Sequence, residues 1–125
     1  MGWVEGKPAM TVTLYGITTC DTVRKARAWL DQQGVAYRFH DFRREGLEAG
    51  RLAGWFDALG WEAVLNRAGT SFRALPEAER TGLDRDRAAA LILGNPTLVK
   101  RPVLEAEGEV MVGFRPATYA ALFSR

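Results

Sequence analysis

The sequence is poor in the residues that make disulfide scaffolds and metal sites. It has 125 residues but only one cysteine, Cys20, and one histidine, His40. A single cysteine cannot form an internal disulfide, which excludes a disulfide-stabilised scaffold and favours a reducing compartment. One cysteine and one histidine are also too few for a typical zinc site. We therefore expect a cytoplasmic protein that holds no metal ion and no resident cofactor.

Long apolar runs and a large excess of one charge are missing as well. No stretch is apolar over the roughly 20 residues that a membrane-spanning helix needs, and residues 1–9 lack the apolar core of a signal peptide. Seventeen Lys and Arg residues stand against fifteen Asp and Glu residues, a net charge of +2 without a dense basic block. We therefore predict binding neither to nucleic acid nor to membranes.

What the composition does contain suits one globular domain. Hydrophobic residues make up 47% of the chain and charged residues 26%, which is ordinary for a folded soluble protein. A chain of this length can bury one core. Because Met10 directly precedes the first predicted strand, residues 1–10 are interpreted as an N-terminal extension and residues 11–125 as a single domain.

The most informative stretch is residues 11–34, TVTLYGITTCDTVRKARAWLDQQG. The β-branched and aromatic residues at 11–15 predict a strand. Apolar residues then recur at helical spacing, at Val23, Ala26 and Leu30. Thr19 is the predicted N-cap of this helix, and Gly34 is its predicted stop. Cys20 therefore lies at or within the first turn of a helix that follows a strand.

This position bears on the chemistry of the only thiol. A helix N-terminus offers unpaired N–H groups and a partial positive charge, which lower the pKa of a thiol there and can hold an oxyanion. Arg24 lies one turn further along the helix, on the same face as Cys20, and its positive charge favours a thiolate there. Asp21 has the opposite effect, because its negative charge repels a thiolate. A lone cysteine is more often a small buried hydrophobe. The strand–turn–cysteine–helix context favours an activated thiol over that alternative.

After a second predicted strand, the chain shows helical patterns and returns to strand patterns only near its end. Helices are predicted over residues 47–60, 76–80 and 84–93. Further strands are predicted over residues 36–42, 103–106 and 110–113. His40 is interpreted as an ordinary strand residue. Residues 43–46 are interpreted as a polar turn and residues 66–73 as a loop. Asp84 is interpreted as a helix cap, and Pro116 is predicted to start the last helix. The order is β-α-β, a helical block, then β-β-α, with the first two strands parallel.

This order, with a cysteine at the start of the first helix, resembles the thioredoxin fold. The helical block makes it similar to the arsenate reductase (ArsC) family, in particular its Spx/YffB-like branch, over about residues 11–119. The resemblance implies an α/β thioredoxin-like fold with a mixed four-stranded sheet and an inserted all-helical subdomain at about residues 46–99. Four motifs carry it: YGITTCDTVRKA at residues 15–26, NxxGTxxR at 66–73, NPxLxKRPV at 95–103 and VGFRP at 112–116.

The resemblance also implies residue roles. Cys20 matches the nucleophilic cysteine of the family. Pro102 matches the cis-proline that faces the active cysteine in thioredoxin-like folds. Three residues match the arginines that surround the thiolate and bind the oxyanion in the reductases, namely Arg73, Arg101 and Arg115. Thr19, next to the cysteine, is added to the predicted anion-binding residues.

Together these features predict a monothiol reductase. The Cys20 thiolate would attack arsenic in arsenate or sulfur in a disulfide, and arginines would stabilise the charge that moves onto oxygen. Because no second cysteine exists, an outside thiol must resolve the covalent intermediate. The family suggests glutathione as co-substrate, with glutaredoxin as a partner. The alternative is a non-enzymatic transcriptional regulator that binds RNA polymerase, as the Spx regulators do. Val23 stands where those regulators often have a second cysteine, which excludes a dithiol switch.

Overall fold

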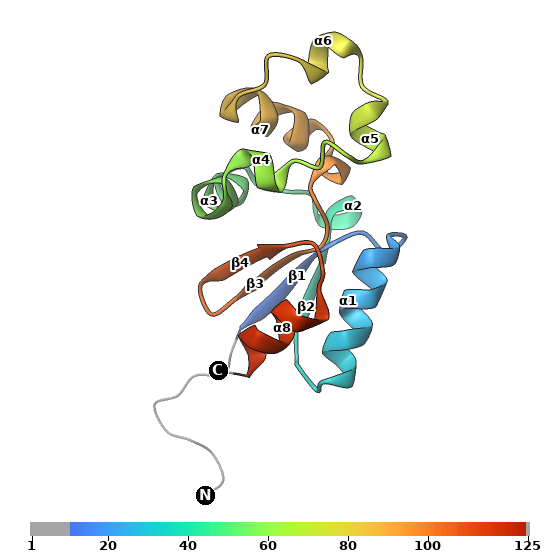
Figure 1. The fold of residues 1–125 in the computed structure, drawn as a ribbon, viewed down its shortest axis with the longest axis vertical. Helices are drawn as coiled ribbons and strands as arrows, with labels where there is room; N and C mark the ends of the chain where they lie inside the picture. The colour runs from blue at the N-terminus through green and yellow to red at the C-terminus, as the bar shows by residue number, and fades with distance from the viewer. Residues whose placement is uncertain (1–10, 125) are drawn as a thin grey trace, which may run out of the picture.

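The computed structural model describes residues 11–124 (Figure 1). The predicted N-terminal extension, residues 1–10, lies outside the described residues. The chain forms β1 (Val12–Gly16), α1 (Asp21–Gln32) and β2 (Arg38–Asp41), then a series of helices, and ends in β3 (Val103–Ala106), β4 (Glu109–Val112) and α8 (Pro116–Phe123). The β-α-β, helical, β-β-α order predicted from the sequence is confirmed.

The four strands form one mixed sheet in the order β2-β1-β3-β4. Strand β1 pairs parallel with β2 and antiparallel with β3, and β3 pairs antiparallel with β4. The parallel pair is joined through α1, whereas β3 and β4 are joined by a tight turn at Glu107 and Gly108, both with positive φ. This is the mixed α/β, thioredoxin-like arrangement that was expected.

Strand alternation divides the core between the two faces of the sheet. Leu14 and Leu104 point to one face, where α1 and α8 cover them with Leu30 and Leu122. Tyr15 and Val103 point to the other face, where the helical part of the chain covers them. Figure 1 shows these layers, with α3 to α7 beyond one side of the sheet and α1 and α8 against the other. One chain therefore builds two apolar clusters with the sheet between them.

The helical insertion consists of short elements between β2 and β3. These are α2 (Phe42–Glu45), α3 (Ala49–Leu59), α4 (Trp61–Val64), α5 (Thr70–Arg73), α6 (Glu77–Arg80), α7 (Arg85–Gly94) and the 3-10 turn η1 (Pro96–Leu98). Asp84 caps α7 as predicted, since its side chain accepts a hydrogen bond from the Arg87 backbone N at 2.8 Å. Helix α2 replaces the predicted polar turn, because the Asp41 carboxylate caps it by accepting from Arg43 N at 2.9 Å.

Glu105 joins the sheet to the helical insertion. Its carboxylate accepts hydrogen bonds from Tyr15 OH at 2.8 Å, Trp55 Nε1 at 2.7 Å and Arg51 Nη1 at 2.8 Å. Burial alone would raise the pKa of Glu105, but these hydrogen bonds outweigh it and hold the pKa below its usual value. Burial and the bond to Glu105 raise the pKa of Tyr15. Because Tyr15 lies in β1 and Trp55 in α3, this network fixes the insertion over the sheet.

Two further properties concern the described residues as a whole. None of their helices has the length and apolar character to cross a membrane. Within residues 11–124, no group of three or more His, Cys, Asp and Glu side chains is placed to hold a metal ion.

Candidate functional site

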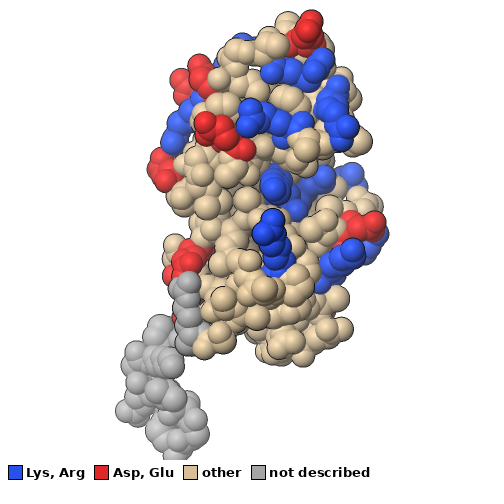
Figure 2. Space-filling view, in the orientation of Figure 1, with Lys and Arg blue, Asp and Glu red and all other residues tan. Residues whose placement is uncertain are grey.

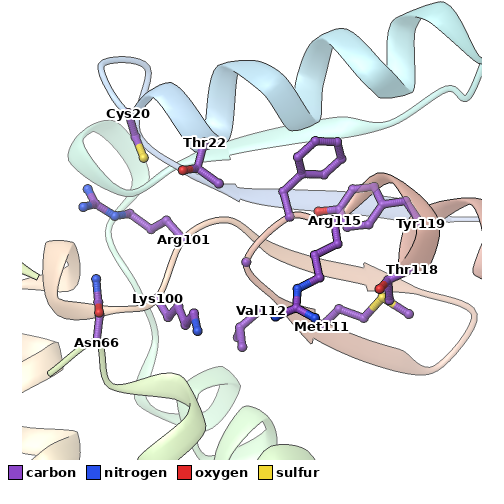
Figure 3. Close-up of a pocket in the computed structure, with 12 residues that line it drawn as sticks. Cys20, Thr22, Asn66, Lys100, Arg101, Met111, Val112, Arg115, Thr118 and Tyr119 are labelled. Atoms are coloured by element: carbon purple, nitrogen blue, oxygen red, sulfur yellow. The ribbon is translucent and has the colours of Figure 1, made fainter. Parts of the chain in front are cut away.

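A pocket of about 550 Å³ opens at the N-terminal end of α1 (Figure 3). Four segments that are far apart in the sequence line it. They are the first turn of α1 with Cys20, the turn after α4 with Asn66, the segment that leads into β3 with Lys100 and Arg101, and the β4–α8 connection with Arg115. The pocket therefore lies where the two halves of the sheet domain meet the helical insertion.

Cys20 is the N-cap residue of α1, and no side-chain cap bond forms there. The predicted N-cap, Thr19, is wrong, because the helix begins one residue later. Cys20 is half-buried, its carbonyl accepts from Arg24 N at 3.0 Å, and its thiol faces the pocket. Gly16 allows β1 to approach the helix this closely, since a Cβ there would lie 2.7 Å from a Val23 methyl group. The turn between them therefore presents the thiol at the edge of the sheet.

The wall opposite Cys20 is held by an isolated β-bridge between Leu65 and Val99. Asn66 N donates to Leu98 O at 2.8 Å, and Lys100 N donates to Val64 O at 2.8 Å. This pairing brings the side chain of Asn66, from the turn after α4, and that of Lys100, from the end of the helical insertion, into one pocket.

Arg101 and Pro102 continue this wall toward β3. The Arg101–Pro102 peptide bond is cis, which is the isomer that the resemblance implied. Figure 3 shows the Arg101 side chain extending to the same end of the pocket as Cys20. Its Nε is buried and has no hydrogen-bond partner among the described residues. A donor of fixed positive charge is therefore available beside the thiol.

The third wall is the connection from β4 into α8. Gly113 has a φ of 77° and donates from its N to Pro102 O at 2.9 Å. A Cβ at Gly113 would lie 3.6 Å from Lys100 Cε, so the Lys100 stem runs along this wall. Tyr119 lines the pocket from α8, and burial raises the pKa of its hydroxyl. That hydroxyl is buried and has no hydrogen-bond partner within the described chain.

The electrostatic character of the pocket is strongly one-sided. Lys100, Arg101 and Arg115 line it, and no Asp or Glu does. None of these three cations takes part in an ion pair found within residues 11–124. Figure 2 shows Lys and Arg side chains gathered around the hollow between the helical insertion and the sheet. Such a site attracts anions and stabilises negative charge that develops on sulfur or oxygen.

The structure brings together some of the residues predicted from the sequence and leaves others apart. Cys20, Arg101 and Arg115 line the same pocket. Arg73 does not, because its guanidinium folds back and donates to the carbonyl of Ala68. Thr19 does not line the pocket either.

Two arginines lie near the start of α1, and one of them differs from expectation. The Thr19 hydroxyl accepts from Arg43 Nη1 at 3.2 Å, so an arginine from α2 lies over the turn before Cys20. Arg24, expected to support the thiol, instead pairs with Asp21 and donates to Thr18 O at 3.3 Å. Its charge is therefore shared with a neighbouring carboxylate.

Several pocket residues were not assigned a role from the sequence. Asn66 and Lys100 fall within the motifs at residues 66–73 and 95–103, which was the only available signal. Thr22 likewise falls within the motif at residues 15–26, whereas Thr118 lies in no motif. Tyr119 sits at helical spacing with Leu122, a pattern that predicts burial and gives no information on the partner of its hydroxyl.

Comparison with known proteins identifies a matching family model and solved structures with a similar fold. A model of the ArsC family matches residues 15–122. A solved structure of a protein named YFFB is 51% identical, with a TM-score of 0.86 over 88% of this chain and 96% of that one. A solved arsenate reductase (ArsC) related protein from Brucella melitensis is also 51% identical, with a TM-score of 0.75 over 96% of this chain and 100% of that one. The global transcriptional regulator Spx of Listeria innocua is 28% identical over 82% of this chain and 79% of its own.

Proposed function

The chain belongs to the ArsC family, and we propose that it is a monothiol reductase in which Cys20 attacks a disulfide and glutathione resolves the product. One observation carries the proposal. The only thiol of the chain faces a pocket with three cationic side chains and no carboxylate, and it sits at the positive end of a 12-residue helix. Such surroundings stabilise negative charge on the attacking sulfur and on a departing thiolate.

The proposed reaction uses two outside thiols and one protein thiol. The Cys20 Sγ thiolate attacks the glutathione sulfur of a mixed disulfide G–S–S–R, a Cys20–S–S–G bond forms, and R–S⁻ leaves. A second glutathione thiolate then attacks the bound glutathione sulfur, which gives G–S–S–G and returns the Cys20 thiolate. Glutaredoxin can take the place of that second thiol. With arsenate as the alternative substrate, the Cys20 thiolate attacks arsenic and one arsenate oxygen leaves as water. A first glutathione thiolate then attacks Cys20 Sγ, so that a Cys20–S–S–G bond forms and arsenite leaves with the electron pair of the S–As bond; a second glutathione returns the Cys20 thiolate as above.

Arg101 is the pocket cation that the proposal places closest to the chemistry. Its guanidinium extends to the Cys20 end of the pocket (Figure 3) and has a buried Nε without a partner. A guanidinium remains charged at any working pH and offers several N–H donors in one plane. It is therefore suited to the charge that moves onto the leaving sulfur or onto an arsenate oxygen.

The test is a single-turnover reaction followed by a turnover assay. Glutathione disulfide should add one glutathione to the wild-type protein, detected by intact mass, and Cys20→Ser should add none because no other cysteine exists. Turnover is then measured with a glutathionylated peptide or arsenate as substrate and with glutathione and glutaredoxin as reductants. It should fall about ten-fold or more in Arg101→Ala, because the variant loses a charged hydrogen bond. Lys25→Ala removes an exposed charge from α1 and is the matched control. A wild-type protein that forms no adduct and turns over neither substrate would reject the proposal.

A second function follows from the similarity to the Spx regulator. In that case the chain binds RNA polymerase and does not need a reactive thiol. Val23 occupies the place of a second cysteine, so this regulator would lack a dithiol switch. Binding of polymerase by both the wild type and Cys20→Ser, without turnover, would favour the regulator. Turnover that depends on Cys20, without polymerase binding, would favour the reductase.

A further inference from the structure

We propose that the pocket contains a second anion-binding position, separate from the thiol, that holds a carboxylate of a small thiol or of its disulfide. The inference rests on the proposed function, because it concerns which sulfur compound reaches Cys20. Lys100, Arg115 and the Tyr119 hydroxyl form this position, and Arg101 serves the thiol end. The ligand class is a carboxylate-bearing thiol peptide, in contrast to a single tetrahedral oxyanion such as arsenate.

The first argument is size. The pocket measures about 550 Å³. A tetrahedral oxyanion fills roughly the space of four waters, on the order of 120 Å³ at about 30 Å³ each. Pockets of roughly 300–1,000 Å³ are those that hold small organic molecules. The space beyond an oxyanion at Cys20 is therefore large enough for the remainder of a peptide-sized ligand.

The second argument is the placement of the cations. Figure 3 shows Arg101 extending to the Cys20 end, whereas Arg115 extends to the opposite side, beside Met111 and Val112. The stem of Lys100 also lies along that opposite wall, against Gly113. Arg115 and Lys100 are exposed, and neither takes part in an ion pair found in the described part of the chain. Two cations are thus available at a distance from the thiol.

The third argument is the Tyr119 hydroxyl. Tyr119 is only 1% exposed, and its hydroxyl has no partner in the protein, although Tyr119 forms part of the pocket wall. Figure 3 shows its ring projecting from α8 toward Arg115 and Thr22. Its edge-to-face contact with Phe114, at 4.8 Å between ring centroids, fixes the ring in this direction. A buried donor left without an acceptor is destabilising, and a ligand carboxylate between it and Arg115 would supply the acceptor.

These positions define how the ligand lies. Its carboxylate pairs with Arg115, Lys100 and Tyr119, and its sulfur lies at Cys20 next to Arg101. The Cys20 thiolate then attacks the sulfur of this seated half, a bond forms between the two sulfurs, and the other half of the disulfide leaves as a thiolate. The leaving half needs no recognition, so the site selects the glutathione-like half of a mixed disulfide.

The test compares a carboxylate-bearing disulfide with a neutral one. Second-order rate constants for adduct formation at Cys20 are measured by intact mass with glutathione disulfide and with bis(2-hydroxyethyl) disulfide. The ratio of the two constants should fall about ten-fold or more in Arg115→Ala and in Lys100→Ala, and by a smaller factor in Tyr119→Phe. Lys25→Ala should keep the wild-type ratio. A ratio that stays the same in Arg115→Ala and Lys100→Ala would overturn the second position.

A binding measurement without turnover makes the test independent of disulfide chemistry. S-methylglutathione carries the carboxylates but cannot react, and it should protect Cys20 of the wild type from iodoacetamide. Arg115→Ala should lose most of this protection. Equal protection by phosphate at the same concentration would show that one anion position is enough and would overturn the inference. If Cys20 reacts with neither disulfide, the proposed function itself fails, whereas reaction with both at ratios unaffected by Arg115 rejects only the second position.

Discussion

Replacing Tyr119 with phenylalanine should stabilise the protein, which is unusual for a buried tyrosine. Tyr119 is 1% exposed and packs against Trp29 and Phe114 at centroid distances of 5.7 and 4.8 Å. Phenylalanine keeps these ring contacts. It removes a buried hydroxyl without a partner, whose burial costs about 1–3 kcal/mol. We expect Tyr119→Phe to raise the free energy of unfolding by about 1 kcal/mol or more.

Tyr15 provides a matched control, because the same substitution there should have the opposite sign. Tyr15 is 2% exposed, but its hydroxyl donates to Glu105 Oε1 at 2.8 Å. A hydrogen bond to a charged group contributes about 1.5–3 kcal/mol. Tyr15→Phe should therefore lower the free energy of unfolding by about 2 kcal/mol, and the two variants should differ by about 3 kcal/mol.

The assay is urea unfolding followed by tryptophan fluorescence, with equal slopes required before midpoints are compared. For a chain of this size, 1 kcal/mol corresponds to about 3–6 °C in Tm. The reasoning is refuted if Tyr119→Phe destabilises the protein as much as Tyr15→Phe does. That result would mean that the Tyr119 hydroxyl is satisfied in the free protein, and the argument for a ligand acceptor there would lose its basis.

Three further predictions concern how the site is supported. The pKa of Glu105 is lowered in the folded protein, so its ionised carboxylate stabilises the fold above about pH 4.3, and this stabilisation is lost as the pH falls through the folded-state pKa. The difference in free energy of unfolding between the wild type and Glu105→Gln should therefore decrease when unfolding is measured from pH 7 down to pH 3. Gly16→Ala should lower the free energy of unfolding by about 1–3 kcal/mol and slow Cys20 adduct formation, since the new Cβ would lie 2.7 Å from Val23; an unchanged urea midpoint and rate would contradict this. Asp84→Ala should cost about 1 kcal/mol through loss of the α7 cap, while Asp84→Asn should cost less; equal midpoints for all three proteins would exclude the cap.

The parts of the fold that were predicted correctly depend on local sequence signals. Residues 11–34 contain a strand pattern, a glycine and a helical period in sequence, and β1 and α1 form there. The hairpin at β3 and β4 and the Asp84 cap also depend on residues a few positions apart. In each case the local preference and the tertiary fold agree, so the sequence alone is sufficient.

The features that the sequence did not predict have several physical causes. Thr19 and Cys20 are neighbouring candidates for the α1 N-cap, and the Thr19 hydroxyl instead accepts from Arg43, 24 residues away. Arg73 matches a family motif, but its guanidinium binds the nearby Ala68 carbonyl, a side-chain conformation that no spacing predicts. Helix α2 has four residues, too few for a helical period to be visible.

The second anion position also follows from a requirement of monothiol chemistry. Because the protein has one thiol, the substrate and then the resolving thiol must enter the same pocket, the first to react with Cys20 and the second to react with the ligand bound to it. The first product is a disulfide between Cys20 and the seated ligand, and the second thiol must attack the ligand sulfur in line with that bond. A bound ligand that could rotate freely would present this geometry only part of the time. Arg115 and Lys100, by holding its carboxylate away from the thiol, would fix the direction in which the ligand sulfur faces. Their loss should therefore slow the resolving step as well as the first attack, and single-turnover release of glutathione disulfide from the adduct measures that step separately.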